Sequence, residues 1–319
     1  MKAKDYENKL IMAASLCFAA AMVVFPAVTE SGSKTAIVIW ANSIVPILLP
    51  FFIFADFIKR VGNPERLPLK VYPFVIAFMS GYPMGAKIVG DLTAGGCFTE
   101  EEGKHVLSYS LVTGPAFIIG TVGAFMGNTG AAVAVAIAHY IGALLNGFIY
   151  RCSAQTRCIS CDRSRKVNVK ARVNDGIGTD LHTQPKSYME SFTASIIAGF
   201  KAMAVILAYL ILFMIAMELL DSIGIFTLLP GEPWSAFAKG IIEMTVGANM
   251  IGICNISIAL KTALTAFIIS FGGLSVIGQS VSMAAGSGLG LGTILQVKLT
   301  HGLIAGILAA VFSTIILEI

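Results

Sequence analysis

The sequence predicts an all-α, polytopic transmembrane helical bundle built from an inverted repeat, each half with a re-entrant or broken helix. Composition is the first observation: hydrophobic residues make up 56% of the 319 residues and charged residues 13%, against about 25% charged in soluble domains. Mean hydropathy is +0.82. The other two observations are recurrent apolar runs and a pair of matching motifs, one in each half of the chain.

Several apolar runs are long enough to cross a bilayer, which takes roughly 20 helical residues. They are Leu10–Val28, Ala36–Ile58, Ala131–Tyr150, Phe192–Leu219 and Leu303–Leu317. Leu10–Val28 follows a basic N-terminus, as a signal peptide would. It is long for a signal sequence and lacks a convincing small-x-small cleavage site, so we expect a retained span.

The matching motifs are Gly85-Ala86-Lys87-Ile88-Val89-Gly90 and Gly247-Ala248-Asn249-Met250-Ile251-Gly252, set 162 residues apart. Three further matches share this offset without gaps: Asp56 with Glu218, Gly62 with Gly224, and His139 with His301. A duplication is the simplest cause. The predicted organisation is an N-terminal helix and outer loop (1–35), a first repeat (36–150), a basic cytoplasmic loop (151–190) and a second repeat (191–319).

The distribution of basic residues predicts the orientation. Seven basic residues and one acid between Arg151 and Arg172 mark a cytoplasmic loop by the positive-inside rule, and anionic lipids are candidate partners. Thr29–Thr35 is then a short outer loop. The loop stays inside only if Val71–Leu92 enters and leaves on one face, with full spans at roughly Val106–Phe125 and Ala131–Tyr150. The second half then runs inverted.

The basic loop also contains Cys152, Cys158 and Cys161, with His182 downstream. Their irregular spacing argues against a structural zinc site, so no metal or other cofactor is predicted. No aromatic residue lies among the basic residues of the loop, which argues against a nucleic-acid partner. The sequence leaves a homo-oligomer open.

The first candidate site is the interruption at Ser80-Gly81-Tyr82-Pro83-Met84-Gly85, because glycine and proline break helical hydrogen bonding. A helix that starts there presents N–H groups that attract anions. Lys87 adds a positive charge at membrane depth, where ionisable residues are functional candidates. The alternative is an internal ion pair between Lys87 and Asp91, one helical turn apart.

Three more interruptions supply candidate substrate-binding residues. Thr113, Gly114 and Pro115 form the second, and Glu243 and Asn249 belong to the third, in which Asn249 replaces Lys87. Glu243 either binds a proton or cation or caps a helix. The fourth contributes Gly272, Gly273, Ser275 and Gln279. His139 and His301 are expected to stabilise helix interfaces.

No catalytic or phosphate-binding motif is found, so we expect no enzyme, and transport would be secondary or passive. The runs Ser80-Gly81-Tyr82-Pro83-x-Gly85-Ala86-Lys87, Gly114-Pro115-Ala116-Phe117-Ile118 and Gly272-Gly273-Leu274-Ser275-Val276-x-x-Gln279 resemble the sporulation integral membrane proteins of the YlbJ type. These belong to the wider nucleoside-recognition or gate group, which is related to concentrative nucleoside transporters and ferrous-iron permeases.

The resemblance implies a transporter of spore-forming bacteria, in the inner membrane or in the outer forespore membrane, with dipicolinate as substrate. We therefore expect a secondary transporter or facilitator of a small organic anion. Lys87 would hold a carboxylate, and Ser275 and Gln279 would orient the ring. The alternatives are a nucleoside or metal-ion transporter and a non-transporting membrane scaffold in spore assembly.

Overall fold

The computed structural model describes residues 2–61, 67–154 and 187–317, and every regular element in these ranges is helical. The predicted all-α bundle is confirmed to this extent. Within these ranges, five helical stretches are long and apolar enough to cross a membrane: Pro26–Ile58, Thr129–Arg151, Tyr188–Ser222, Ile258–Met283 and Leu291–Ile315. The basic loop, with Cys158, Cys161 and His182, lies outside the described residues, as does the side chain of Cys152.

The N-terminal region differs from the prediction. Helix α1 (Lys2–Val24) ends before Phe25, and α2 (Pro26–Ile39) continues through the π-helix η1 (Trp40–Ile44) into α3 (Val45–Val61). The predicted span Leu10–Val28 is therefore divided, and the predicted outer loop Thr29–Thr35 is helical. Pro26 occupies the first turn of α2, where a missing N–H costs nothing and the fixed φ suits a helix.

The predicted broken element in Val71–Leu92 is confirmed. It consists of α4 (Tyr72–Ser80) and α5 (Met84–Ala94), which Gly81 separates with φ 71°. Only glycine adopts such a φ readily. Next, α6 (Glu100–Ser110) starts with a capping box between Thr99 and Glu102.

The single span predicted for Val106–Phe125 is wrong. Helix α6 ends at Ser110, residues 111–114 are non-helical, and the π-helix η3 (Phe117–Val122) and α7 (Gly123–Met126) follow. The Gly114-Pro115 pair is the physical reason, because the residue before proline is biased away from the helical region. Helix α8 (Thr129–Ala154) completes the first half.

The second half repeats this order of elements. Helix α10 (Tyr188–Ser222) precedes a short 3-10 helix, η5 (Ile225–Leu228), and the helix pair α11 (Glu232–Ile242) and α12 (Met244–Ile253). Helices α13 (Ile258–Phe271) and α14 (Gly273–Met283) meet at Gly272, and α15 (Leu291–Leu317) ends the described chain. The predicted boundaries at residues 35, 150 and 190 fall inside α2, α8 and α10, and the division into repeats stays a prediction.

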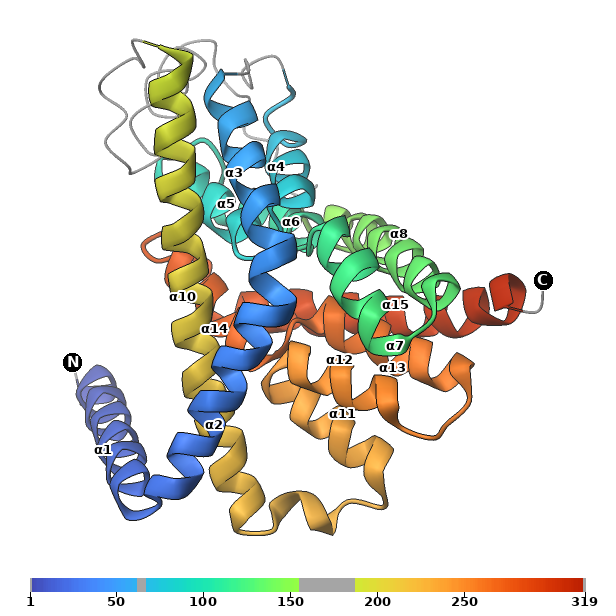
Figure 1. The fold of residues 1–319 in the computed structure, drawn as a ribbon. Helices are drawn as coiled ribbons and strands as arrows, with labels where there is room; N and C mark the ends of the chain where they lie inside the picture. Colours follow the sequence, from blue (N-terminus) through green and yellow to red (C-terminus); the bar gives the residue numbers. More distant parts are fainter. Residues whose placement is uncertain (1, 62–66, 155–186, 318–319) are drawn as a thin grey trace.

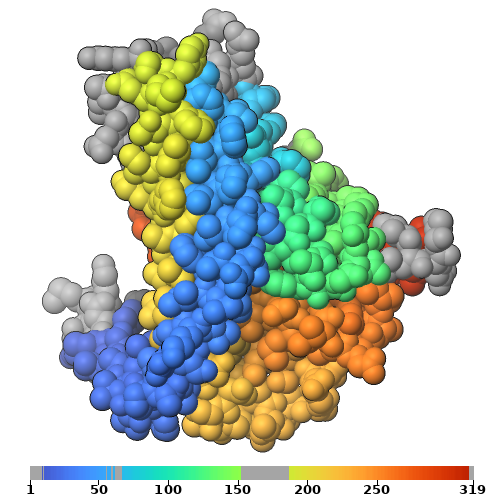
Figure 2. All heavy atoms as spheres, in the orientation of Figure 1, coloured from blue at the N-terminus to red at the C-terminus, as the bar shows by residue number. Residues whose placement is uncertain are grey.

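The bundle has two packing units, which Figures 1 and 2 show side by side. The arm consists of α2, η1 and α3 running antiparallel to α10, with Trp40 bonded to the Met203 carbonyl at 3.0 Å and Phe57 against Phe192. The core consists of α4–α8 and α11–α15. Buried apolar residues of the arm cluster together with Phe226 of η5 and Val246 of α12. Those of the core form one large cluster and a small one of Ala77, Val112 and Ala143.

Close backbone packing through glycine is one source of fold specificity, and it is testable at Gly247. A Cβ atom at Gly247 would lie 2.1 Å from Gly240 Cα, so α11 and α12 would have to separate. We expect Gly247→Ala to cost roughly 1–3 kcal/mol and to lower the melting temperature of the detergent-solubilised protein.

Gly292→Ala is the matched control, because nothing lies within 4 Å of the added Cβ atom. It should leave the melting temperature unchanged. Equal melting temperatures for both variants would show that the α11–α12 contact does not limit stability.

Candidate functional site

The four helix breaks of the core meet in the middle of the molecule. Gly81 of the α4–α5 break packs against Gly114 of the α6–η3 break: a Cβ at Gly81 would lie 3.0 Å from the Gly114 nitrogen. The second half has the same arrangement, because a Cβ at Gly273 would lie 3.0 Å from the Met244 nitrogen. The α4–α5 break therefore contacts the α6–η3 break, and the α11–α12 break contacts the α13–α14 break.

A cavity of about 50 Å³ lies where these breaks converge. On this measure one water needs roughly 10–15 Å³, so the cavity holds a few waters or a small ion. Its apolar wall comes from the arm and includes Leu48, Phe52 and Leu210. Its other wall comes from the breaks, and the predicted site residues in it are Ser80, Gly81, Tyr82, Thr113, Gly114, Glu243, Ser275 and Gln279.

Four helices begin within two residues of a residue that lines this cavity: α5, η3, α12 and α14. The first N–H groups of a helix have no intrahelical partner, and they carry the positive end of the helix dipole. At α12 this position is occupied, since the Glu243 carboxylate accepts a hydrogen bond from the Val246 N–H at 2.8 Å. Glu243 thus caps a helix, and it is only 3% exposed.

The remaining predicted residues lie around the cavity but do not line it. Pro83 precedes α5, Pro115 precedes η3, Asn249 lies half-buried on α12, and Gly272 and Gly273 form the α13–α14 break. A Cβ at Gly85 would lie 2.0 Å from the Ser110 carbonyl oxygen, so this glycine is a packing position.

Lys87 also lies outside the cavity lining. Its Nζ donates to Asp91 Oδ2 at 3.1 Å, and about a quarter of each side chain is exposed. The ion pair considered as the alternative therefore forms. A role of Lys87 in binding substrate stays a prediction.

Sequence reasoning missed Lys298, on α15. It is the one Lys or Arg among the described residues with its side chain fully buried, at 1% exposure. Its Nζ donates to the Leu111 carbonyl at 3.1 Å and also to the Tyr82 hydroxyl. The same Nζ lies 4.2 Å from the centre of the Tyr82 ring. These are acceptors and a π face, which suit an ammonium group.

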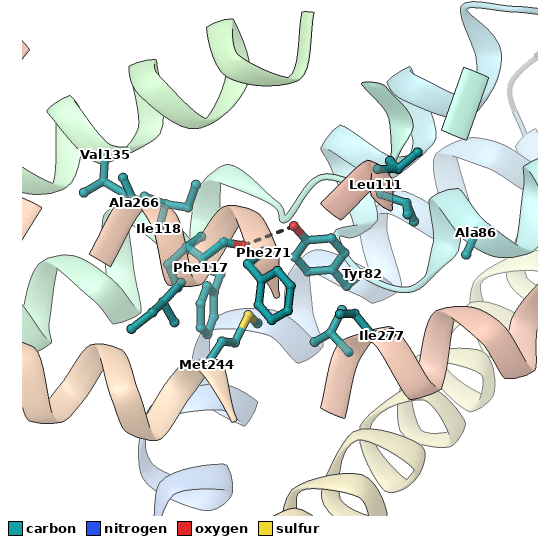
Figure 3. Close-up of a cluster of buried hydrophobic side chains, with 14 of the residues drawn as sticks. Tyr82, Ala86, Leu111, Phe117, Ile118, Val135, Met244, Ala266, Phe271 and Ile277 are labelled. Atoms are coloured by element: carbon teal, nitrogen blue, oxygen red, sulfur yellow. Dashed lines mark hydrogen bonds between the residues drawn. The ribbon is translucent and has the colours of Figure 1, made fainter. Parts of the chain in front are cut away.

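Tyr82 connects Lys298 to the cavity. Its ring lines the cavity, its hydroxyl accepts from Lys298, and the same hydroxyl donates to the Ile269 carbonyl on α13 at 3.1 Å. Figure 3 shows Tyr82 reaching toward α13 beside Phe271, with Met244 and Ile277 in the same cluster. The sequence signal that could have identified Lys298 is a lone lysine in an otherwise apolar stretch. Because Lys298 precedes the predicted span Leu303–Leu317, it was not expected at membrane depth.

Helix α8 supplies partners for the backbone of the α6–η3 break. His139 Nε2 accepts from the Thr113 N–H at 3.1 Å, so its Nδ1 carries the proton and donates to Ser270 at 2.8 Å. The Tyr140 hydroxyl donates to the Thr113 carbonyl at 2.9 Å. His301 donates from Nε2 to the His139 carbonyl at 2.8 Å. Both histidines stabilise interfaces, as expected.

Comparison with known proteins gives one informative relative. The chain is 24% identical over 334 aligned positions to the sporulation integral membrane protein YlbJ of Bacillus subtilis (strain 168), covering 94% of this chain and 81% of the relative. The resemblance inferred from the motifs is thereby confirmed: the chain is a homologue of a sporulation membrane protein and is a multi-pass integral membrane protein. No family model matches the chain. No solved structure matches it either.

Lys298 is the most connected side chain at this site, and its removal is the next prediction. Lys298→Met leaves the Leu111 carbonyl and the Tyr82 hydroxyl oxygen without their donor. Buried acceptors that lose a partner cost about 1–3 kcal/mol, so the melting temperature should fall.

Lys104→Met is the control, since Lys104 Nζ donates to Gln296 at 3.1 Å at the surface of the same bundle. It should melt like the wild type. A Lys298→Met protein as stable as the Lys104→Met protein would show that Lys298 does not hold the breaks together.

Proposed function

We propose that this protein is a secondary transporter or facilitator of a small organic anion, which binds in the cavity where the four breaks meet. The observation that carries the proposal is the convergence of helix N-termini around one cavity. Transporters with discontinuous helices use such N-termini to bind anionic groups of their substrates. With α12 capped by Glu243, and with the Phe117 and Ile118 N–H groups of η3 bonded to the Gly114 carbonyl, the ends of α5 and α14 remain for substrate.

Lys298 supports an anionic substrate as well. Its ammonium form would place a positive charge directly behind Tyr82, and in the described residues no carboxylate forms an ion pair with it. A charge buried without a counter-ion is costly. A carboxylate in the cavity would lower this cost. Lys298, in place of Lys87, would then hold the substrate carboxylate.

Dipicolinate is the substrate we propose. It is a small aromatic dianion, so its ring suits the apolar wall formed by Leu48, Phe52 and Leu210, and its carboxylates suit the helix N-termini. Ser275 and Gln279 would orient the ring. A molecule of this size exceeds the present cavity, so the arm and core must separate to admit it. The homology to a sporulation protein supports action in spore formation, in the inner membrane or the outer forespore membrane.

We also infer an inverted repeat. Equivalent long helices of the two halves pack antiparallel: Gly32 contacts Ile215 and Phe54 contacts Phe192 in the arm. In the core, α8 and α15 cross so that the repeat-equivalent residues His139 and His301 lie with ring centres 4.8 Å apart. A two-fold axis through such a crossing would lie in the membrane plane, which is the arrangement of inverted transporters.

Uptake into liposomes tests the proposed function. The purified full-length protein should take up labelled dipicolinate saturably, with unlabelled dipicolinate competing and uridine or Fe²⁺ competing little. Ser275→Ala and Gln279→Ala should each raise KM roughly 3- to 10-fold, the equivalent of one lost hydrogen bond.

Ser282→Ala is the matched control on the same helix, because its hydroxyl bonds Tyr209 at 2.9 Å and does not line the cavity. It should keep the wild-type KM. Uptake of uridine or Fe²⁺ in place of dipicolinate would establish one of the alternative transport functions. A well-folded protein that transports none of the three would favour a membrane scaffold.

The two lysines give a further prediction. Lys298→Met should abolish uptake even at a temperature where the variant is folded, because the cation beside the cavity is lost. Lys87→Ala should keep most of the uptake, since Lys87 is paired with Asp91 outside the lining. If uptake is lost with Lys87→Ala but kept with Lys298→Met, the anion binds at Lys87 on α5 and not beside Lys298.

A further inference from the structure

Glu243 carries the one carboxylate in the cavity lining. It lies at the start of α12, its side chain is 3% exposed, and one oxygen accepts from the Val246 N–H at 2.8 Å. The corresponding position of the first half, by the 162-residue offset, is Gly81. At this position of the cavity, the second half therefore has an acidic group where the first half has glycine.

The titratable groups packed around the cavity have other partners. Tyr82 bonds Lys298 and Ile269, Lys298 bonds Tyr82 and Leu111, and His139 bonds Thr113 and Ser270. On α11, Lys239 donates to Asp221 at 2.9 Å. His301 donates to the His139 carbonyl. Within the described ranges, no cationic side chain forms an ion pair with Glu243.

A substrate carboxylate in this cavity would therefore meet an unneutralised carboxylate at close range. Two like charges in one buried site cannot both stay ionised at low cost, and one of them takes up a proton. The acid form of Glu243 keeps the Val246 hydrogen bond through its carbonyl oxygen. It also gains an O–H group, which can donate to the substrate.

We propose that Glu243 is the proton-coupling site of the transporter, so that one proton binds Glu243 as the anion enters the cavity and leaves when the anion is released. The proton comes from the solution on the entry side and returns to the solution on the other, so the carboxylate is regenerated. This inference rests on the proposed function. It adds the proton as the coupling ion of the proposed transporter, and it assigns Glu243, in the second half, as the single coupling group.

The test uses the full-length protein in liposomes with the membrane voltage clamped. We expect an inward proton gradient to drive accumulation of labelled dipicolinate, up to about tenfold for a pH difference of one unit with one proton per cycle. An inward Na⁺ gradient should drive none. In Glu243→Gln, accumulation should be lost, while exchange of labelled for unlabelled dipicolinate continues.

Glutamine is a suitable replacement because its amide oxygen can still accept from the Val246 N–H and preserve the helix cap. Glu232→Gln is the control: it removes an exposed carboxylate from the first turn of α11 and should keep proton-driven accumulation. A second readout is proton uptake when dipicolinate is added to the solubilised protein in weak buffer. The wild type should take up one proton per anion and Glu243→Gln none.

The outcomes separate the two proposals. Proton-driven accumulation in Glu243→Gln, or wild-type uptake driven by Na⁺ or unaffected by pH gradients, would overturn the coupling role while leaving anion transport in place. A wild type that neither binds nor transports dipicolinate would overturn the proposed function, and the coupling role with it.

Discussion

The structure depends on one constraint: backbone polar groups exposed by a helix break inside hydrocarbon must find partners within the protein. The core contains four such breaks, and each frees N–H and C=O groups that a continuous helix would satisfy. Side chains from distant helices supply the partners. Lys298 serves Leu111, His139 and Tyr140 serve Thr113, and Tyr82 serves Ile269. The long helices α8 and α15 thus hold the breaks in register.

The same constraint explains why the breaks lie together. A break buried alone would need a complete set of partners, whereas two glycine-containing breaks can approach until their backbones touch, as Gly81 and Gly114 do. The cavity is the space that remains where the two pairs meet. Its polar lining is thus a consequence of how interrupted helices are accommodated in a membrane protein. The same polar groups are then available to bind a ligand.

Local signals made much of this predictable from the sequence. Glycine and proline mark breaks through their own backbone preferences, so the positions of the interruptions at Gly81, Gly114 and Gly272 could be read directly. The prediction of a repeat came from the constant 162-residue spacing of matching residues. The direction of a side chain depends on how helices pack, and the sequence does not specify that. Lys87 points to Asp91, while Lys298, from a helix more than 200 residues away, reaches Tyr82.

The kinds of contact around the cavity also suggest which boundary can move. The breaks are joined to α8, α13 and α15 by buried hydrogen bonds, which are costly to break without replacement. The arm meets the cavity through apolar side chains such as Phe52 and Leu210. Side-chain bonds between arm and core are few in the described residues: Thr121 to the Ser43 carbonyl, Tyr209 to Ser282, and Lys239 to Asp221. Apolar surfaces slide without leaving polar groups unsatisfied, so access to the cavity should open between the arm and the core, with the hydrogen-bonded breaks moving as a unit.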